Sequence, residues 1–482
     1  MTTKILWLRQ DLRLSDNPAL RAACKNTQNL LVVFIDDPLD QTLSSLGAAS
    51  RVWLHHSLES LQQDLSKLGQ RLLCFQGDSE AVLASLVQAS GADLVCWNRC
   101  YDPVSMDRDI RIKSSLAKLT EVTSFNGLLI AEPWKGCKED GTAYRVFTPY
   151  YRNLSRVLPL EPPLAAPRKL PVMIDSERLR PIEGQIHDVA GLGLLPQSDW
   201  HEAMMSHWQT GERAARRQLK RFLASPVENY GVDRDIPSVQ GTSALSPHLH
   251  FGEISPRQIA HELYKVRPEV VEKKTGAETF LKEVFWREFA YHLLYHFPDM
   301  VDQPLDKRFS KFPWPKTPAD ALSRWQQGRT GVPIVDAGMR QLWQSGWMHN
   351  RVRMIVASYL IKNLMSPGQQ GERWFRDTLV DADLASNVMG WQWTAGCGAD
   401  AAPYFRVFNP VLQGKKFDPE GHYVKAWVPE LAALDRKSIH EPWELDDTER
   451  ANLDYPHPMV DLKASRVRAL EAFDSIKKPL DA

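Results

Sequence analysis

Residues 1–130 alternate short apolar runs with segments of helical periodicity, and this alternation restricts the fold more than any other feature of the chain. The runs ILWL, LLVVFI, RLLCFQ and DLVCWN have the length and apolar content of buried strands, whereas residues 51–68 place apolar side chains at helical spacing. Because parallel strands need crossover connections, the pattern predicts a Rossmann-like α/β domain with a parallel sheet. No GxGxxG or GxxxxGK(S/T) motif follows any of the runs, so a dinucleotide or triphosphate site of the usual kind is not indicated.

Helical periodicity replaces this alternation in the second half of the chain, where Pro and Gly turns separate the helical segments. A proline-rich stretch at residues 158–171 precedes it and predicts a long surface linker. We therefore expect an α/β domain at 1–132, an interdomain linker at 133–205, and a larger all-α domain at 206–482.

Composition excludes several classes of protein. Lys plus Arg and Asp plus Glu number 59 each, so a nucleic-acid partner would have to bind a local basic patch. The six cysteines have no CxxC spacing, which argues against a disulfide framework or a structural zinc site and favours the reducing cytoplasm. We find no signal peptide and no apolar run long enough to span a bilayer, so we expect a soluble protein with neither a metal nor a membrane partner.

The stretch DADLASNVMGWQWTAG, which begins at Asp381, combines carboxylates, an amide and indoles. If it is helical, Asp383, Asn387 and Trp391 lie on one face at intervals of four residues. The chain contains no HExxH motif and no serine–histidine–acid pattern, so hydrolysis is poorly supported. Electron transfer through an aromatic cofactor fits this set of side chains better.

The segment ETFLKEVFWREFAYHLL places Glu283 and Arg287 four residues apart. Such a pair usually lies on an exposed helix face. Here apolar neighbours such as Phe280 leave little exposed face, and a buried Glu283 could be held protonated and donate a hydrogen bond to a ligand carbonyl. Both interpretations remain open.

The segment GWMHNRVRM places Asn350, Arg351 and Met354 on one helical stripe. Asn can read a base edge, Met offers an adaptable apolar surface, and Arg can reach phosphate, so the stripe suits a flipped-out base. An amphipathic helix with solvated arginines explains the segment equally well.

The segment QGTSALSPHLHFG places the hydroxyls of Thr242, Ser243 and Ser246 before a proline-bounded helix start. Backbone N–H groups and hydroxyls at such a start can bind an anion such as a phosphate. Helix capping is the simpler explanation, and it uses the same groups.

Taken together, these motifs resemble the photolyase/cryptochrome family, most closely its bacterial class I cyclobutane pyrimidine dimer photolyases. The resemblance covers nearly the whole chain, from LWLRQDLRLSDNPAL to DAAPYFRVFNPVLQGKKFDPEG. It implies an N-terminal antenna domain, a helical FAD-binding domain, and a lyase that repairs UV-damaged DNA under blue light. In this activity reduced FAD donates an electron to a flipped-out pyrimidine dimer. The resemblance also implies a monomer with no obligate protein partner.

The resemblance carries residue roles with it. Glu283 would hydrogen-bond a lesion carbonyl, and Asn387 would face the reactive ring nitrogen of the flavin. The implied cofactor-binding residues are Tyr230, Thr242, Ser243, Ala244, Leu245, Ser246, Phe280, Arg287, Asp381, Asp383 and Asn387. The implied DNA-binding residues are Arg234, Glu283, Trp286, Asn350, Arg351, Met354, Trp393, Arg406 and Gln413.

Three positions depart from the family pattern. In the family's tryptophan relay to the flavin, Trp391 matches the inner position and Trp314 the outer one, but the middle one falls on Gly368, with Trp374 as a nearby substitute. Photoreduction is therefore expected to reroute through Trp374 or to be slow. Ala244 stands where some relatives carry arginine. The segment YDPVSMDRD lacks the Asn–Glu pair that holds folate in some relatives, so methenyltetrahydrofolate is the first expectation for the antenna and a deazaflavin the second.

Three alternatives to dimer repair remain. A cryptochrome-type blue-light photoreceptor is the main one, although such proteins often add a long C-terminal tail and the plant members carry aspartate where this chain has Asn387. A six-four photolyase is expected to place histidines near the lesion, where this chain has Asn350 and Met354. A nicotinamide-dependent flavin oxidoreductase is disfavoured because the glycine-rich fingerprint is missing.

Overall fold

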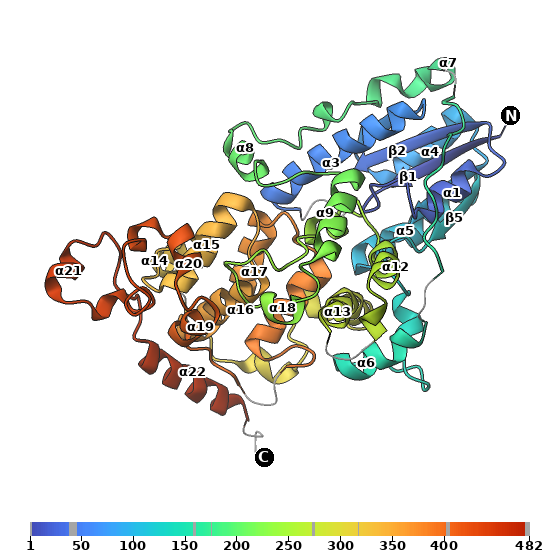
Figure 1. Cartoon of the computed structure of the whole chain (residues 1–482). Coiled ribbons are helices and arrows are strands. Elements are labelled where there is room, and N and C mark those ends of the chain that lie inside the picture. The colour runs from blue at the N-terminus through green and yellow to red at the C-terminus, as the bar shows by residue number, and fades with distance from the viewer. Residues whose placement is uncertain are drawn as a thin grey trace. The chain divides into compact units, whose positions relative to one another are not determined.

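The computed structural model describes most of the chain, and its elements can be followed in Figure 1. The described residues are 2–37, 46–157, 161–174, 176–271, 275–316, 318–401 and 405–477. They form two compact units. Unit 1 contains Met1–Ser225, Ser243–Pro298 and Val380–Leu384, and unit 2 contains Pro226–Thr242, Asp299–Leu379 and Ala385–Ala482. These units have other boundaries than the sequence-predicted domains, because residues 243–298 belong to unit 1.

Unit 1 contains a five-stranded parallel sheet with the strand order β3-β2-β1-β4-β5. Its strands are β1 (Thr3–Leu8), β2 (Asn29–Asp36), β3 (Leu72–Gln76), β4 (Leu94–Asn98) and β5 (Glu121–Phe125). The four apolar runs of the sequence form β1 to β4, so the predicted parallel sheet is confirmed. The sequence did not single out β5, whose residues are only partly buried.

Helices cover both faces of this sheet. Along β2, Leu30, Val32 and Phe34 contribute to one apolar core and Leu31, Val33 and Ile35 to the other, as the alternation of side chains along a strand requires. The first core is completed by α1 (Pro18–Cys24) and α3 (Ala48–Lys67), and the second by α4 (Ser79–Ser90) and α5 (Pro103–Leu116). Because both faces are buried, the central strands read as continuous apolar runs in the sequence.

The described part of the predicted linker contains short helices. They are η1 (Pro133–Gly136), α6 (Phe147–Leu154), η2 (Ser155–Val157), α7 (Ser176–Leu179), η3 (Arg180–Gln185), η4 (Ala190–Leu192) and α8 (Trp200–Met205). Leu170 and Ile174 are buried in the two cores of the sheet domain. This part of the segment is therefore packed into unit 1, although its proline content predicted a surface linker.

The remaining helices of unit 1 are α9 (Glu212–Ala224), α11 (Ser246–His250), α12 (Pro256–Val266), η5 (Pro268–Val271) and α13 (Gly276–His296). Helix α12 begins with a capping box, in which Ser255 and Gln258 satisfy each other's backbone N–H groups. Thr275 caps α13 by accepting a 3.0 Å hydrogen bond from the backbone of Glu278. These caps fix the start of the helix that carries Glu283 and Arg287.

Unit 2 is helical in its described residues, as the sequence predicted. Its helices are α10 (Tyr230–Asp233), η6 (Pro298–Val301), η7 (Lys307–Lys311), α14 (Ala319–Gln326), α15 (Pro333–Ser345), α16 (Asn350–Ser358), η8 (Tyr359–Asn363), α17 (Gly368–Thr378), α18 (Leu384–Ala395), α19 (Pro410–Phe417), α20 (His422–Trp427), η9 (Pro429–Leu431), η10 (Pro442–Glu444), α21 (Asp447–Ala451) and α22 (Leu462–Lys477). Element η8 is a π-helical segment, a form often found at functional sites. Among the described residues, no helix combines the length and the apolar character needed to cross a membrane.

Candidate active site

Helix α13 of unit 1 carries four of the predicted site residues. Phe280 is buried, whereas Glu283, Trp286 and Arg287 are half-buried. The partial exposure of Glu283 agrees neither with a fully solvated surface pair nor with full burial, and it leaves the carboxyl within reach of a ligand. The Trp286 ring is stacked on Phe147, with 3.8 Å between the ring centroids, so its orientation is fixed by packing.

Arg287 is held in place by backbone carbonyls. Its Nη1 donates to the oxygen of Leu128 at 3.0 Å and its Nη2 to the oxygen of Leu249 at 3.5 Å. The guanidinium also lies over the ring of Tyr291, 5.0 Å from its centroid. These contacts fix a positive charge, with further donors available, beside the carboxylates that follow.

Asp381 and Asp383 are both buried, and Asp383 lies among polar partners in unit 1. The hydroxyl of Tyr291 donates to Asp383 Oδ2 at 2.5 Å, and Nδ1 of His250 lies 3.9 Å from the same oxygen. Burial alone would raise the pKa of Asp383, but the nearby His250 and the charge of Arg287 lower it well below its ordinary range. Asp383 is therefore a fixed anion that can accept an N–H from a ring such as the pyrimidine part of a flavin.

The segment predicted to bind phosphate leads into α11. The helix begins at Ser246, and just before it the backbone N–H of the N-cap residue, Leu245, donates to Oγ of Ser243 at 3.4 Å, so a hydroxyl of the segment takes part in the helix start as the capping explanation expects. The Leu245 side chain is buried, which leaves only its backbone for a ligand. Ala244 has a backbone φ of +50°, which residues other than glycine rarely adopt. The carbonyl of Ser243 accepts a hydrogen bond from Gln218 Nε2 at 2.7 Å. Phosphate binding here remains a prediction.

In unit 2, Tyr230 is buried and the Arg234 guanidinium lies over its ring, 5.6 Å from the centroid. Thr242 is half-buried, and the structure pairs it with none of the other predicted residues. On α16, Asn350 is exposed at the first helical position and Met354 is half-buried. Arg351 Nη2 donates to Asp235 Oδ1 at 2.6 Å, so Asp235 competes with phosphate for this arginine.

Asn387 has a defined amide orientation in unit 2. Its Nδ2 donates to Glu372 Oε1 at 3.0 Å, and Arg376 holds the same carboxylate with two Nη2 contacts of 2.7 Å. The amide nitrogen therefore faces Glu372, which places Oδ1 on the opposite side of the amide. No sequence motif pointed to Glu372 or Arg376, although their i, i+4 spacing on α17 is a usable signal.

Trp391 is buried on α18, where its ring packs edge-on against Phe375 with 5.0 Å between centroids. A Cβ at Gly371 would lie 2.0 Å from Trp391 Cη2, so the ring depends on glycine at that position. Because α18 begins at Leu384, Asp383 lies just before the helix, and only Asn387 and Trp391 share the expected helical face.

The structure brings Trp391 and Trp314 to the wall of one cavity in unit 2, which Gly368 also lines. Trp374 is half-buried on α17, and its ring is stacked on Trp343 at 5.9 Å with the planes 3° apart. Trp343 is 65% exposed, so this pair connects α17 with solvent. Trp374 is thus stacked on Trp343, whereas Trp314 lines the cavity that Trp391 and Gly368 also line.

The last predicted residues lie near the end of α18 and on α19. Trp393 is half-buried, and its Nε1 donates to the carbonyl of Asp400 at 3.2 Å. Trp393 and the exposed Arg406 line one small cleft of unit 2, beside the buried amine of Lys362. Gln413 is half-buried on α19, and the structure pairs its side chain with none of the other predicted residues.

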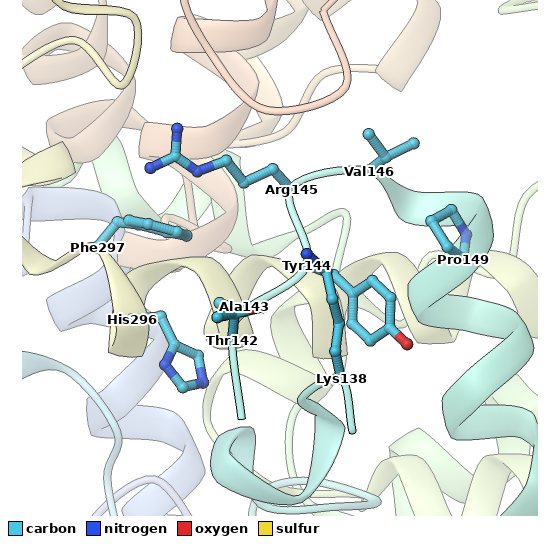
Figure 2. A pocket seen from close by; sticks show the side chains of 9 residues that line it. All are labelled: Lys138, Thr142, Ala143, Tyr144, Arg145, Val146, Pro149, His296 and Phe297. Atoms are coloured by element: carbon cyan, nitrogen blue, oxygen red, sulfur yellow. The ribbon is translucent and has the colours of Figure 1, made fainter. Parts of the chain in front are cut away.

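A groove in unit 1 contains none of the predicted residues (Figure 2). Its volume is about 650 Å³, and its walls include Lys138, Tyr144, Arg145, His296 and Phe297. The Arg145 guanidinium lies 4.5 Å from the centroid of the Phe297 ring. Exposed cations interleaved with aromatic rings are typical of surfaces that contact nucleic acid, but no sequence motif pointed to this groove.

The described residues fit the polar and aromatic chemistry of a flavin. Asp383 is an anionic acceptor, Arg287 a cationic donor, Asn387 an oriented amide, and Trp391 an oxidisable ring. The first two belong to unit 1 and the last two to unit 2. Each unit thus carries part of the set that the sequence predicts around the cofactor.

Comparisons with known proteins agree with these observations. Residues 4–168 match the family described as DNA photolyase, and residues 280–475 match the FAD binding domain of DNA photolyase. The chain is 45% identical to a deoxyribodipyrimidine photo-lyase of Agrobacterium fabrum, with 98% of each chain covered. It is also 35% identical to cryptochrome-1 of Arabidopsis thaliana, covering 98% of this chain and 70% of that protein.

Solved structures agree as well. The fold matches a bacterial class III photolyase from Agrobacterium tumefaciens with a TM-score of 0.92 and 42% identity, covering 99% of this chain and 98% of the other. A cryptochrome of Synechocystis matches with a TM-score of 0.87 and 28% identity, covering 98% and 99%. The family and FAD predictions are confirmed, whereas assignment to class I stays a prediction beside this likeness to class III. The chain belongs to the photolyase/cryptochrome family and carries its FAD-binding domain.

Proposed function

We propose that the protein is a deoxyribodipyrimidine photolyase that repairs cyclobutane pyrimidine dimers in UV-damaged DNA under blue light. The observation that carries this proposal is the Glu372-oriented amide of Asn387, which stands in the same helix as the buried Trp391. Bound FAD in its reduced form would supply the light-driven electron that splits the dimer. The protein residues would bind and orient the cofactor and the lesion.

Helix α13 supplies the groups that would meet the lesion. Trp286, fixed by stacking on Phe147, offers a flat apolar surface to a base taken out of the duplex. Glu283 lies one helical turn before Arg287 and is half-buried, and in its protonated form its carboxyl would donate a hydrogen bond to a carbonyl of the dimer in a partly dehydrated site. On the cofactor side, Arg287 and Asp383 would bind polar groups of FAD.

A blue-light photoreceptor is the second candidate, favoured by the 35% identity to a plant cryptochrome. The two candidates differ in what they do to damaged DNA, because a photolyase restores the thymines and a photoreceptor leaves the lesion intact. We expect the purified, reduced protein to restore thymines in an oligonucleotide with one cyclobutane dimer and to leave a six-four photoproduct unchanged, as resolved by chromatography. Repair of the six-four lesion alone would overturn the proposed substrate.

The contact between Asn387 and Glu372 gives a specific prediction. Glu372→Gln removes a charged acceptor held by Arg376, and glutamine can present either oxygen or nitrogen to the amide. Since a hydrogen bond to a charged group contributes about 1.5 kcal/mol or more, we expect dark air reoxidation of the reduced flavin to become about tenfold faster. Absorption at flavin wavelengths measures this rate. Glu420→Gln, at an exposed carboxylate, is the control, and equal rates in both variants would contradict the orienting role.

The route of photoreduction gives a second prediction. Trp374→Phe replaces an oxidisable ring that is stacked on the exposed Trp343. If a reductant in solution passes its electron to the flavin through this pair, photoreduction of the oxidised flavin should slow by about tenfold in the variant. This factor corresponds to a barrier increase of about 1.4 kcal/mol. Repair by chemically reduced protein should not change. Normal photoreduction in this variant would rule out the route, and Trp200→Phe, in unit 1, is the control.

DNA binding should depend strongly on salt even though the net charge is +0. Each lost phosphate contact lowers the slope of log affinity against log salt by about 1 unit, so we expect this change in Arg234→Ala. The exposed Arg436, which pairs with Glu420, is the matched control. Fluorescence anisotropy of a labelled dimer duplex between low and moderate salt measures both slopes. A flat response in the unmodified protein would refute the proposed basic rim.

The proposal extends to the antenna and to the working state. Methenyltetrahydrofolate is the first candidate and a deazaflavin the second, on the family resemblance alone, and the absorption spectrum of the extracted chromophore distinguishes them. We also propose a monomer that works in the cytoplasm without an obligate protein partner. The cysteine pattern of the sequence supports that compartment.

A further inference from the structure

Unit 2 contains a cavity of about 280 Å³ between two indole rings. Trp391, Trp314 and Phe309 contribute aromatic surface to its wall, and Val388 and Ala395 contribute aliphatic surface. Because an apolar cavity of about 150 Å³ is already large enough to bind benzene, this one has room for a larger planar ring. All the lining residues belong to unit 2, so the cavity is defined within one compact body.

The cavity has space at Gly368, the first residue of α17. A Cβ built there would lie 3.5 Å from Ile361 Cδ1 and 3.7 Å from Trp391 Cε3, which are ordinary van der Waals distances. Gly368 has no positive φ, so a side chain would not strain the backbone. The space beside Gly368 is therefore large enough for a side chain or a ligand, and glycine leaves it unfilled. At Gly371, by contrast, Trp391 occupies the space that a Cβ would need.

Polar groups also line the cavity. Three residues with carboxylate or amide side chains, Glu372, Gln303 and Gln369, are among those that line it. Glu372 accepts hydrogen bonds from Asn387 and Arg376, and an ionised carboxylate has about four acceptor sites. The wall thus combines flat aromatic surface with acceptors for an N–H group. Binding pockets for small planar molecules have this composition.

We propose that this cavity binds a small, neutral, bicyclic aromatic molecule with a ring N–H, of the indole class. Its ring would pack against Trp391 and Trp314 at Gly368, and its N–H would donate to a polar group of the wall. This part of the inference does not depend on the proposed repair activity.

A second part rests on the proposed function. During photoreduction Trp391 would give one electron to the flavin, the bound aromatic would give one electron to the oxidised Trp391, and Trp314 would give one to the oxidised aromatic. An added thiol would then reduce Trp314, so the ligand is left unchanged. The bound molecule would act as a relay between two indoles that the cavity otherwise separates.

Binding is tested in the dark with 5-fluoroindole as the probe, by fluorine NMR titration of the flavin-loaded protein. We expect saturable binding that weakens about tenfold or more in Gly368→Trp and in the less bulky Gly368→Met, since both side chains fill the cavity. Gly184→Trp, at a position with open space around it in unit 1, should bind as the unmodified protein does. The site would be overturned by absence of saturable binding to the unmodified protein. It would also be overturned if both Gly368 variants bound the probe as tightly as the unmodified protein does.

The relay is tested separately in Trp374→Phe, where photoreduction is expected to be slow. Addition of 5-fluoroindole with a thiol should speed photoreduction about threefold or more, and Trp314→Phe in the same background should abolish this gain. Saturable binding without any increase in the photoreduction rate would refute the relay, while the proposed binding site would still be supported. A protein that shows no photoreduction under any condition would refute the proposed photochemistry, and the NMR titration would still decide on the site.

Discussion

Trp391→Phe is expected to slow photoreduction of the oxidised flavin by about 100-fold or more, the largest kinetic effect of any single substitution considered. Phenylalanine keeps the packing against Phe375 but is much harder to oxidise than an indole. A barrier increase of about 3 kcal/mol is enough for a factor of about 100. Flavin absorption during blue illumination in the presence of a thiol measures the rate.

The same variant separates photoreduction from repair. Protein reduced chemically before illumination should repair dimers at close to the unmodified rate, because Trp391 would reduce the cofactor and has no role in splitting the lesion. Trp200→Phe, at a partly exposed position in unit 1, should change neither rate. If Trp391→Phe is photoreduced normally, the inner position of the relay is misassigned.

Asp383→Asn is expected to cost about 2 kcal/mol in the free energy of unfolding and to lower the flavin content of the purified protein severalfold. The substitution removes an anion that accepts from Tyr291 and lies near His250 and Arg287. Because the pKa of Asp383 is lowered in the folded state, its contribution is present above the ordinary carboxyl pKa and is lost as the pH falls through the lowered value. The difference between variant and unmodified protein should therefore persist from pH 8 to pH 5.

Thermal unfolding and flavin-to-protein absorbance measure the two effects. Glu420→Gln, which alters an exposed ion pair, should leave both quantities unchanged. If Asp383→Asn retained full flavin content and full stability, the anion would contribute neither to cofactor binding nor to the stability of the surrounding polar cluster.

The sequence predicted the sheet well because buried parallel strands leave a strong local signal. The runs around Ile5, Val33, Phe75 and Val95 are apolar on both faces, and all four form strands. Strand β5 has a weaker signal, since its side chains are only partly buried, whereas those of the other edge strand, β3, are almost all buried. The burial of Leu170 and Ile174 was also missed, because proline content describes local backbone preference and carries no information on tertiary packing.

The site was predictable where a residue's role depends on its own chemistry, and less so where it depends on partners distant in the sequence. Asn387 and Trp391 could be proposed from their spacing, but the hydrogen bond from Asn387 to Glu372 spans fifteen residues and two helices. Arg351 was expected to reach phosphate, yet its pairing with Asp235 could not be inferred, since 116 residues separate them. The cavity at Gly368 likewise becomes visible only when α17 and α18 are packed together.

The central claim is light-driven repair, and one measurement tests it most directly. Purified protein with reduced FAD is incubated with an oligonucleotide that contains a single thymine dimer, in blue light and in the dark, and restored thymines are quantified. We expect repair in the light, none in the dark, and strongly reduced repair in Glu283→Ala under the same illumination. An intact dimer in the light, despite a bound flavin that changes its spectrum on illumination, would contradict repair and favour a photoreceptor.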